Sequence, residues 1–337
     1  MLRKHIIPPL LGVLVCILLI VMFGKTPVAA LQSLFADSFT SAYYFGNMLN
    51  TAAFFMIAGT GSALAIKSGN MNLGGEGQVY LGGYIGCLVL VRSTLPPPLT
   101  CVLALLAAAA GGAVMAALSA LLKELRGAAV LLTTFLVSAA TLPVIDGLIT
   151  VQNTNTNMLA LPYIADCYKL PHILPPSPLS ISFFAAILIA LGTWYVMFKT
   201  RYGRKMQLWG AAPEFARYCG YSSRENTYLT LCASGALHSL TGFFAVTGTY
   251  FTCHKGFYVN MGWNALNVAL LSSSNPLAVI PTSLVLAWIF TSASRVSLTQ
   301  GFDFDIAGIV QGVILFSVAL PFAFSRRTRK TAREEKN

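Results

Sequence analysis

The polar residues that interrupt the apolar runs of this sequence are the first candidates for chemistry. Residues 68–78 read SGNMNLGGEGQ and join two apolar runs with almost no spacer. They supply Asn70, Asn72, Glu76 and Gln78, whose donors and acceptors suit a hydroxylated solute. Glycines disfavour a continuous helix, and backbone freed at membrane depth must face protein or a water-filled cavity. This first polar break is therefore either part of a transport path or a tight turn with a solvated Glu76.

A second polar break lies later in the chain. Residues 260–267 read NMGWNALN and contain Asn264 and Asn267, and residues 272–276 read SSSNP. Interrupted segments at matching places in two halves of a membrane protein are the best sequence indication of a transport path. One break follows the second expected span and the other follows the seventh. This offset favours two halves of inverted topology.

A short segment in a basic gap of the sequence is typical of a docking helix. Pro213 suits the first position of a helix, and Gly220 is placed to end it. Glu214 favours the positive end of the helix dipole and Arg217 the negative end, while Phe215 begins an apolar face. A two-turn helix with such a face should dock onto a partner. The alternative is that it lies on lipid.

Motifs for catalysis, nucleotide binding and metal binding are absent from the sequence. Gly24-Lys25-Thr26 imitates the end of a P-loop, but Leu19 stands where that pattern requires glycine. The seven cysteines are scattered without a C-x-x-C, and there is no H-E-x-x-H or G-x-S-x-G. We therefore predict a non-enzymatic chain with no cofactor and no metal site. If ATP drives its function, another subunit must hydrolyse it.

The elements that must position these residues are membrane helices. Of the 337 residues 56% are apolar and 10% charged, whereas a soluble globular chain has about 45–50% and about 25%. A mean hydropathy of +0.70 agrees, and together these values exclude a cytosolic enzyme or a disordered chain. A span needs about 20 residues, so the chain has room for about ten. The expected spans are residues 6–24, 48–66, 71–91, 99–122, 127–151, 179–198, 228–251, 263–271, 276–294 and 306–324.

The net charge of +11 indicates orientation in a bilayer rather than nucleic-acid binding, because Lys and Arg lie in the short gaps between spans. The first apolar run exceeds the usual signal-peptide core of about 7–15 residues, so we expect a retained span. With both termini inside, most of the 22 Lys and Arg residues face the cytoplasm, and Arg295 fits least well. The prediction is one transmembrane domain over residues 1–337, all-α and polytopic, with about ten helices in two inverted halves and with broken or re-entrant segments. Its cytoplasmic loop is 199–226, its external loop 152–178 and its cytoplasmic tail 325–337.

Three stretches of the sequence resemble the permease subunits of bacterial ABC importers. Residues 68–78 are similar to the signature G-x-x-N-[IL]-G-x-E-G-Q of the branched-chain amino acid/ribose permease superfamily. Residues 202–220 resemble its cytoplasmic coupling loop, and residues 262–277 resemble its G-W-x-x-I-A-V-A-L-L-G-x-x-N-P-x-G stretch. Within the superfamily the chain looks most like the nucleoside (basic membrane protein-dependent) importers. The resemblance covers about residues 45–325.

The resemblance implies a site and a set of partners. The translocation path would be lined by Asn70, Asn72, Glu76, Gln78, Asn264 and Asn267. Coupling to the ATPase would use Gly203, Arg204, Pro213, Glu214, Phe215, Arg217 and Gly220. The implied partners are a cytoplasmic ATP-binding subunit, a second non-identical permease and an external substrate-binding lipoprotein, in the lipid of the bacterial inner membrane. The implied substrate is a nucleoside, with purine nucleosides favoured, and nucleic acid is not expected.

Two other functions stay open at this point. A permease for sugars of the ribose or galactose type would share the same architecture. An ion-coupled secondary transporter would use Glu76, Asp146 or His238 as proton sites and would need no ATPase, but the expected docking helix argues against it. We predict instead that Glu76, flanked by Gly75 and Gly77, is structural and accepts backbone N–H bonds from its own broken segment.

Overall fold

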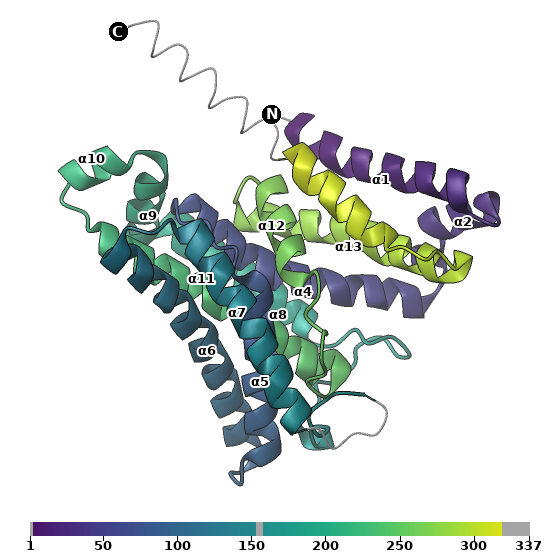
Figure 1. Ribbon diagram of the computed structural model, residues 1–337, viewed down its shortest axis with the longest axis horizontal. Helices are drawn as coiled ribbons and strands as arrows, with labels where there is room; N and C mark the ends of the chain where they lie inside the picture. The colour runs from purple at the N-terminus through teal and green to yellow at the C-terminus, as the bar shows by residue number, and fades with distance from the viewer. Residues whose placement is uncertain (1–2, 153–157, 319–337) are drawn as a thin grey trace, which may run out of the picture.

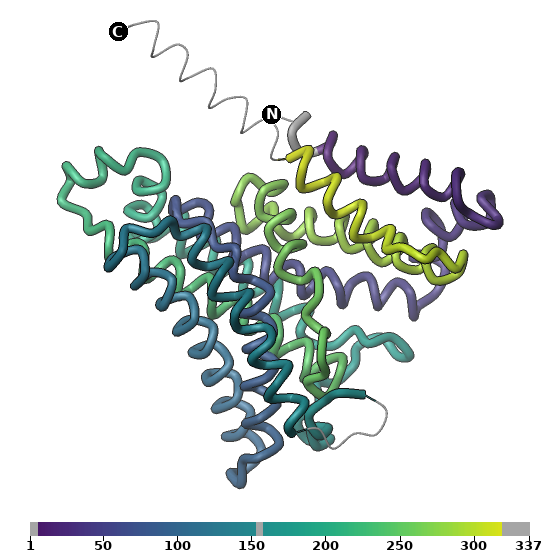
Figure 2. The backbone as a smooth tube through the Cα atoms, viewed as in Figure 1, coloured from purple at the N-terminus to yellow at the C-terminus, as the bar shows by residue number. Residues whose placement is uncertain are grey.

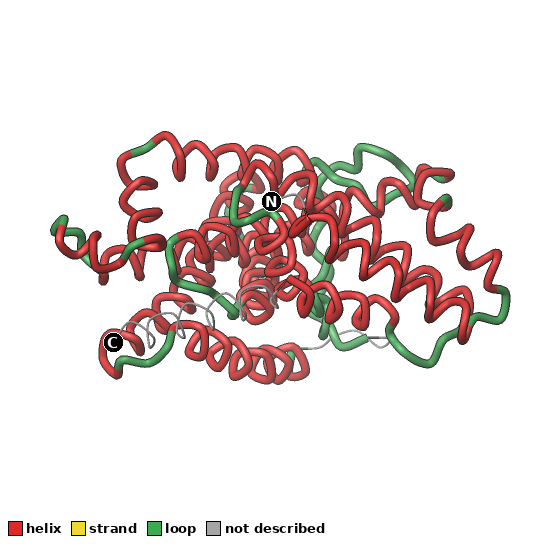
Figure 3. Tube along the Cα trace, turned by 90° about the horizontal axis from the view of Figure 1, so that it is seen from above, coloured by secondary structure: helices red, strands yellow, loops and turns green. Residues whose placement is uncertain are grey.

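The computed structural model describes residues 3–152 and 158–318, and its regular elements are helices (Figure 1). Within those ranges, β-type pairing is limited to two isolated bridges between loop residues. Seen from above, helices account for most of the bundle, and the loops that connect them lie both at its edges and across its middle (Figure 3). The expected tail at 325–337 lies outside the described residues.

Seven helices in the described ranges are long and apolar enough to cross a membrane. They are α1 (Arg3–Phe23), α4 (Ala42–Lys67), α6 (Pro97–Arg126), α7 (Val130–Val151), α8 (Ser182–Lys199), α11 (Ser223–Ala245) with its π-helical extension Val246–Tyr250, and α13 (Pro276–Gln300). The remaining expected segments form shorter or more polar helices: α5 (Gly75–Arg92), α12 (Met261–Leu271) and Ile306–Val318. Each expected span therefore coincides with a helix, and the all-α polytopic class is confirmed.

The loops contain further helices, most of which the sequence pattern did not indicate. α2 (Pro27–Phe35) and α3 (Asp37–Thr40) lie between α1 and α4, and α9 (Arg201–Ala211) begins the basic gap. The expected docking helix is present as α10 (Pro213–Tyr218). Gly220 follows it with φ at 76°, a left-handed conformation that glycine adopts without steric cost and that commonly ends helices.

Two central helices organise the bundle. In α4 and in α11 with its extension, 83% and 67% of the most apolar window is buried, whereas the value is 22% for α1, α7 and α8. α11 packs along α5 and α6, while α4 packs along α12 and α13 (Figure 1). If α4, α5 and α6 correspond to α11, α12 and α13, these are the same contacts made twice. The packing fits two inverted halves that exchange partners.

The two ends of the bundle carry different segments. α9 and α10 project from one end, which we call the α10 end (Figure 2). The connection between α7 and α8 leaves from the opposite end, which we call the cavity end (Figure 2). The sequence analysis assigns these ends to the cytoplasm and the exterior, respectively.

Candidate functional site

The first polar break is a tightly bonded turn between α4 and α5. Asn72 is 3% exposed, and its amide donates to Gln78 Oε1 at 2.9 Å and to Ser234 Oγ at 3.0 Å. Its carbonyl oxygen accepts from the backbone N–H of Gly74 at 2.8 Å. Gln78 is 1% exposed. These side chains replace the backbone hydrogen bonds that a broken helix loses, so in this conformation they are structural groups.

Asn70 joins this break to α6 and α11. Its amide donates to Thr230 Oγ1 at 3.1 Å, and its carbonyl oxygen accepts from Lys123 Nζ at 3.3 Å. Lys123 also donates to Thr227 Oγ1 at 2.8 Å. The contact of Lys123 with the break could not be predicted, because nothing in the local sequence indicates that a lysine at the end of α6 reaches it.

Glu76 connects the two polar breaks directly. Its Oε1 atom accepts from the backbone N–H of Gly262 at 2.9 Å and from that of Trp263 at 3.2 Å. Both donors belong to the first turn of α12, which has no intrahelical acceptor for them, and a carboxylate there also suits the helix dipole. The expectation that Glu76 binds backbone of its own segment is therefore wrong for these bonds, because the donors come from the other half of the chain.

Glycines allow the starts of α5 and α12 to meet. A Cβ atom on Gly262 would lie 2.4 Å from the backbone nitrogen of Glu76 and 2.6 Å from the carbonyl carbon of Gly75. The α10 end has a similar contact, because a Cβ on Gly210 of α9 would lie 2.1 Å from the carbonyl oxygen of Lys67. Backbone contact thus links α9 to the first break, and the first break to the second.

His238 and Asp146, the other proton-site alternatives, have structural partners. The His238 ring is buried, with Nδ1 at 2.8 Å from the Ser234 carbonyl oxygen and Nε2 at 3.1 Å from Ser62 Oγ. Asp146 accepts from the Tyr80 hydroxyl at 2.7 Å. These contacts agree with the hydrogen-bonded roles that such residues usually have inside a bundle.

A cavity of about 740 Å³ opens beside the second break, at the cavity end. Its wall includes five carboxamide side chains, Asn47, Asn50, Asn260, Asn264 and Gln311. It also includes seven aromatic rings, Tyr43, Tyr44, Phe54, Phe55, Tyr250, Phe257 and Phe290. A cavity of this size and lining suits a small molecule with both a flat ring and hydroxyl groups.

Of the six predicted path residues, Asn264 lines the cavity and the other five lie outside its wall. Asn264 lines the cavity, whereas Asn70, Asn72, Glu76 and Gln78 lie in and beside the first break. Asn267 is fully buried, with its amide 3.5 Å from the carbonyl oxygen of Gln311. The role of these six side chains in a path stays a prediction.

Several wall residues were missed by the sequence analysis. Asn50 is a polar residue within the apolar run of α4, which is the sequence signal that could have identified it, and its side chain is 2% exposed. Its amide donates to Thr249 Oγ1 at 2.9 Å. Gln311 carries the same signal, since it lies within the apolar helix Ile306–Val318, whereas Tyr44 does not, because tyrosine is common near the ends of spans.

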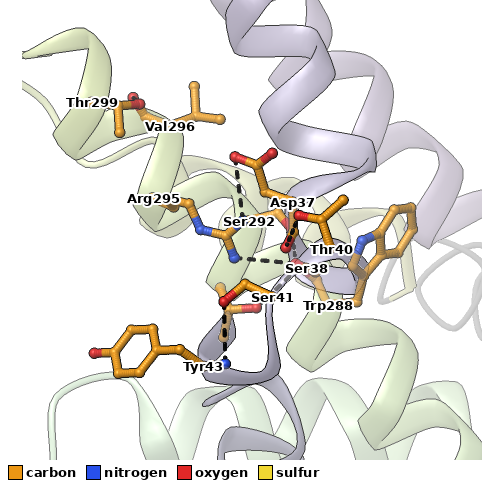
Figure 4. A network of polar contacts seen from close by, with 11 residues as sticks. Asp37, Ser38, Thr40, Ser41, Tyr43, Trp288, Ser292, Arg295, Val296 and Thr299 are labelled. Atoms are coloured by element: carbon orange, nitrogen blue, oxygen red, sulfur yellow. Dashed lines mark hydrogen bonds and ion pairs between the residues drawn. The ribbon is translucent and has the colours of Figure 1, made fainter. Parts of the chain in front are cut away.

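Arg295 lies in the cavity wall, at the centre of a polar cluster (Figure 4). Its side chain is 10% exposed, and its Nη2 atom donates to Ser38 Oγ at 3.2 Å. Nη1 lies 3.8 Å from Asp37 Oδ2, and the Ser38 and Ser292 hydroxyls are 2.9 Å apart. The cluster connects α3 to α13. The Asp37 carboxylate balances the charge of Arg295, which accounts for a largely buried cation at this position in α13.

The α10 end presents an exposed apolar surface on a short helix. Phe215 is 59% exposed and Tyr218 is 90% exposed, and Glu214 and Arg217 form an exposed ion pair at 3.6 Å. Gly203 lies in the first turn of α9, where its N–H donates to Thr200 Oγ1 at 3.1 Å. Arg204 is exposed on the same helix. Exposed aromatic residues on so small a helix are typical of an interaction surface.

Over most of its length the chain is similar to known transport permeases. Residues 44–319 match the family model described as "Branched-chain amino acid transport system / permease component". A probable riboflavin import permease of Treponema pallidum is 30% identical over 315 residues, covering 92% of this chain and 83% of that protein. A guanosine ABC transporter permease of Bacillus subtilis is 23% identical, covering 95% and 94%. A glucose ABC transporter permease of Haloferax volcanii is 29% identical, covering 91% and 87%.

Proposed function

This chain belongs to the branched-chain amino acid transport permease family, and we propose that it carries nucleosides, with purine nucleosides favoured. As a member of this family it is a non-catalytic, multi-pass membrane subunit of an import-type ABC transporter. Permeases of this family work with an ATP-binding subunit and a substrate-binding protein. Membership of this family excludes the alternative of an ion-coupled secondary transporter, because ATP drives an ABC transporter. We propose further that the binding protein is a lipoprotein and that a second, non-identical permease completes the path in the inner membrane.

The lining of the cavity is the observation that supports a nucleoside. Carboxamides donate and accept, which suits both ribose hydroxyls and the polar edge of a base, and the aromatic rings suit its flat face. The relatives named for guanosine and riboflavin are named for compounds that combine a heteroaromatic ring with hydroxyl groups. A sugar offers the hydroxyl groups alone, so the glucose relative keeps a sugar permease as the second candidate.

Uptake competition tests the substrate class. Cells that express the complete transporter would take up labelled guanosine in the presence of excess unlabelled nucleosides, riboflavin, ribose or glucose. We expect purine nucleosides to compete and the sugars and riboflavin to leave uptake unchanged. Competition by a sugar or by riboflavin alone, or an absence of guanosine uptake, would contradict the nucleoside assignment.

We propose that the path begins in the cavity at Asn264 and continues toward the first break. In a background without the seven native cysteines, a cysteine at position 264 should react with a small polar thiol reagent in the absence of nucleotide. Cysteines at positions 70 and 72 should react only in a conformation that opens the break, since both residues are buried and, unlike Asn264, neither lines the cavity. If nucleotide or substrate changes none of these rates, the path lies elsewhere.

We propose that α10 docks onto the ATP-binding subunit, so that the α10 end and both termini face the cytoplasm. Glu214→Lys or Arg217→Glu should lower transport-linked ATP hydrolysis about tenfold, which corresponds to ~1.4 kcal/mol of lost interaction. An exposed ion pair adds little to the stability of the chain itself, so membrane insertion should be unchanged.

The chain contains a matched control for this prediction. Asp166 and Lys169 form another ion pair at the same i, i+3 spacing, located on the connection between α7 and α8. Asp166→Lys should leave ATP hydrolysis intact, because it changes charge at the opposite end of the bundle. Unchanged hydrolysis in both α10 variants would show that α10 does not transmit the ATPase cycle.

A further inference from the structure

We propose that the cavity is a binding subsite for an uncharged oxo-heteroaromatic ring, and that Arg295 donates a hydrogen bond from Nη1 to the ring's carbonyl oxygen. This rests on the proposed nucleoside function and adds the class of base to it. Guanosine and inosine carry such a carbonyl group, whereas adenosine carries an amino group in its place. Three residues of the cavity wall each carry a hydrogen-bonding atom without a partner in the described part of the chain.

The first unused atom is a donor on Arg295. Its Nη1 atom is buried and has no hydrogen-bond partner among the described residues, and the nearest carboxylate oxygen lies 3.8 Å away, beyond hydrogen-bond distance. A buried guanidinium group with a free N–H is costly unless an acceptor completes it. Arg295 lines the cavity, but Nη1 is covered on the side of Asp37, so a rotation of the guanidinium group toward the cavity would bring this donor to an acceptor on a bound solute.

The charges around Arg295 favour a neutral acceptor over an anion. Asp37 lies within ion-pair distance of the guanidinium group and balances its charge. The guanidinium carbon also lies 3.9 Å from the centroid of the Tyr44 ring, a cation–π contact that stabilises the cation further. A carboxylate or phosphate on the solute would add an unbalanced negative charge, whereas a carbonyl oxygen accepts the bond without one.

The other unused atoms in the wall are acceptors. The Oδ1 atoms of Asn50 and Asn264 are buried without a hydrogen-bond partner in the ranges that the structure describes. Both residues line the same cavity as Arg295, one from each half of the chain. A complementary solute must therefore accept one bond and donate others. An oxo-purine nucleoside does both, since it has a carbonyl oxygen, ring N–H groups and ribose hydroxyls.

Arg295 also has a structural contact that a test must separate from recognition. Figure 4 shows it beside Asp37 and Ser38 of α3, where its Nη2 atom bonds Ser38 Oγ. Ser38→Ala and Ser292→Ala remove hydroxyl hydrogen bonds between α3 and α13 but leave Nη1 and its Asp37 neighbour in place. These two variants are the matched controls, because they weaken the tether and not the proposed donor.

The test compares guanosine and adenosine uptake by the complete transporter with the binding protein unchanged, so that any change in selectivity comes from this chain. Arg295→Lys keeps the charge but loses the planar fork of donors. We expect it to lower kcat/KM for guanosine by about ten- to hundredfold, the range for one hydrogen bond to a charged group, and to change adenosine uptake little. Ser38→Ala and Ser292→Ala should keep the wild-type ratio of the two substrates.

Three results would overturn the inference while leaving the nucleoside function standing. Arg295→Lys could lower uptake of both nucleosides equally, or the two serine variants could reproduce its change in selectivity. If Arg295→Lys fails to assemble, binding of guanosine to the wild-type ATPase–permease complex in nanodiscs provides the test. The inference is wrong if 2-aminopurine riboside, which lacks the carbonyl oxygen, competes for that binding as well as unlabelled guanosine does. Absence of any nucleoside uptake by the wild type would instead contradict the proposed function.

Discussion

Glu76→Ala is expected to reduce uptake at least tenfold, while Glu76→Gln retains a substantial part of it. The carboxylate accepts from the backbone N–H groups of Gly262 and Trp263 and so holds the start of α12 against the start of α5. Alanine leaves both donors without that acceptor, at a cost of about 1–3 kcal/mol for each buried group. Glutamine keeps the size of the side chain and one acceptor oxygen, so one of the two bonds can persist.

Uptake into membrane vesicles at fixed ATP, with and without an uncoupler, checks this prediction. The uncoupler should have no effect on the wild type or on either variant, because an ABC importer moves no coupling ion. Protein amounts in the membrane should be measured together with uptake, since loss of the α5–α12 contact also affects assembly. Equal and complete loss in both variants, together with uncoupler sensitivity, would mean that Glu76 carries a proton.

Gly262→Ala is expected to be the most damaging single methyl addition at the contact between the starts of α5 and α12. The new Cβ would lie 2.4 Å from the Glu76 nitrogen and 2.6 Å from the Gly75 carbonyl carbon, both backbone atoms that cannot rotate away. Overpacking of this kind usually costs about 1–3 kcal/mol, and here it also separates Glu76 from its donors. We expect low assembly with the ATP-binding subunit and uptake near background.

Gly192→Ala is the matched control for that substitution. Gly192 lies in α8, where an added Cβ meets no atom within 4 Å, and alanine favours a helix by about 1 kcal/mol over glycine. Gly192→Ala should therefore keep or raise the unfolding temperature of the purified protein and keep the wild-type uptake rate. Gly262→Ala should lower both the unfolding temperature and the uptake rate. If Gly262→Ala assembles and transports like Gly192→Ala, the close contact between the breaks is not required.

Much of the architecture could be predicted because its causes are local. A run of about 20 apolar residues spans a membrane as a helix, so each expected segment coincides with a helix, and seven of these described helices are long and apolar enough to cross. The glycine-dense first segment disfavours helix, and residues 68–74 are non-helical as expected, whereas residues 261–267 of the second expected break form the start of α12. α10 could be predicted since Pro213 and Gly220 act within a few residues of their positions.

The tertiary structure alone decided which distant residues meet. The acceptor for the start of α12 is Glu76, which is 186 residues away from Gly262, and Lys123 reaches Asn70 from a different helix. Arg295 fitted the sequence model least well until α3, a helix that no periodicity indicated, brought Asp37 and Ser38 to it. The cavity likewise combines Asn50 of α4 with Asn264 of α12. Hydropathy and helix-ending residues determine where each helix lies along the chain, but a hydrogen bond across the bundle depends on how helices from two halves pack together, and no local pattern records that.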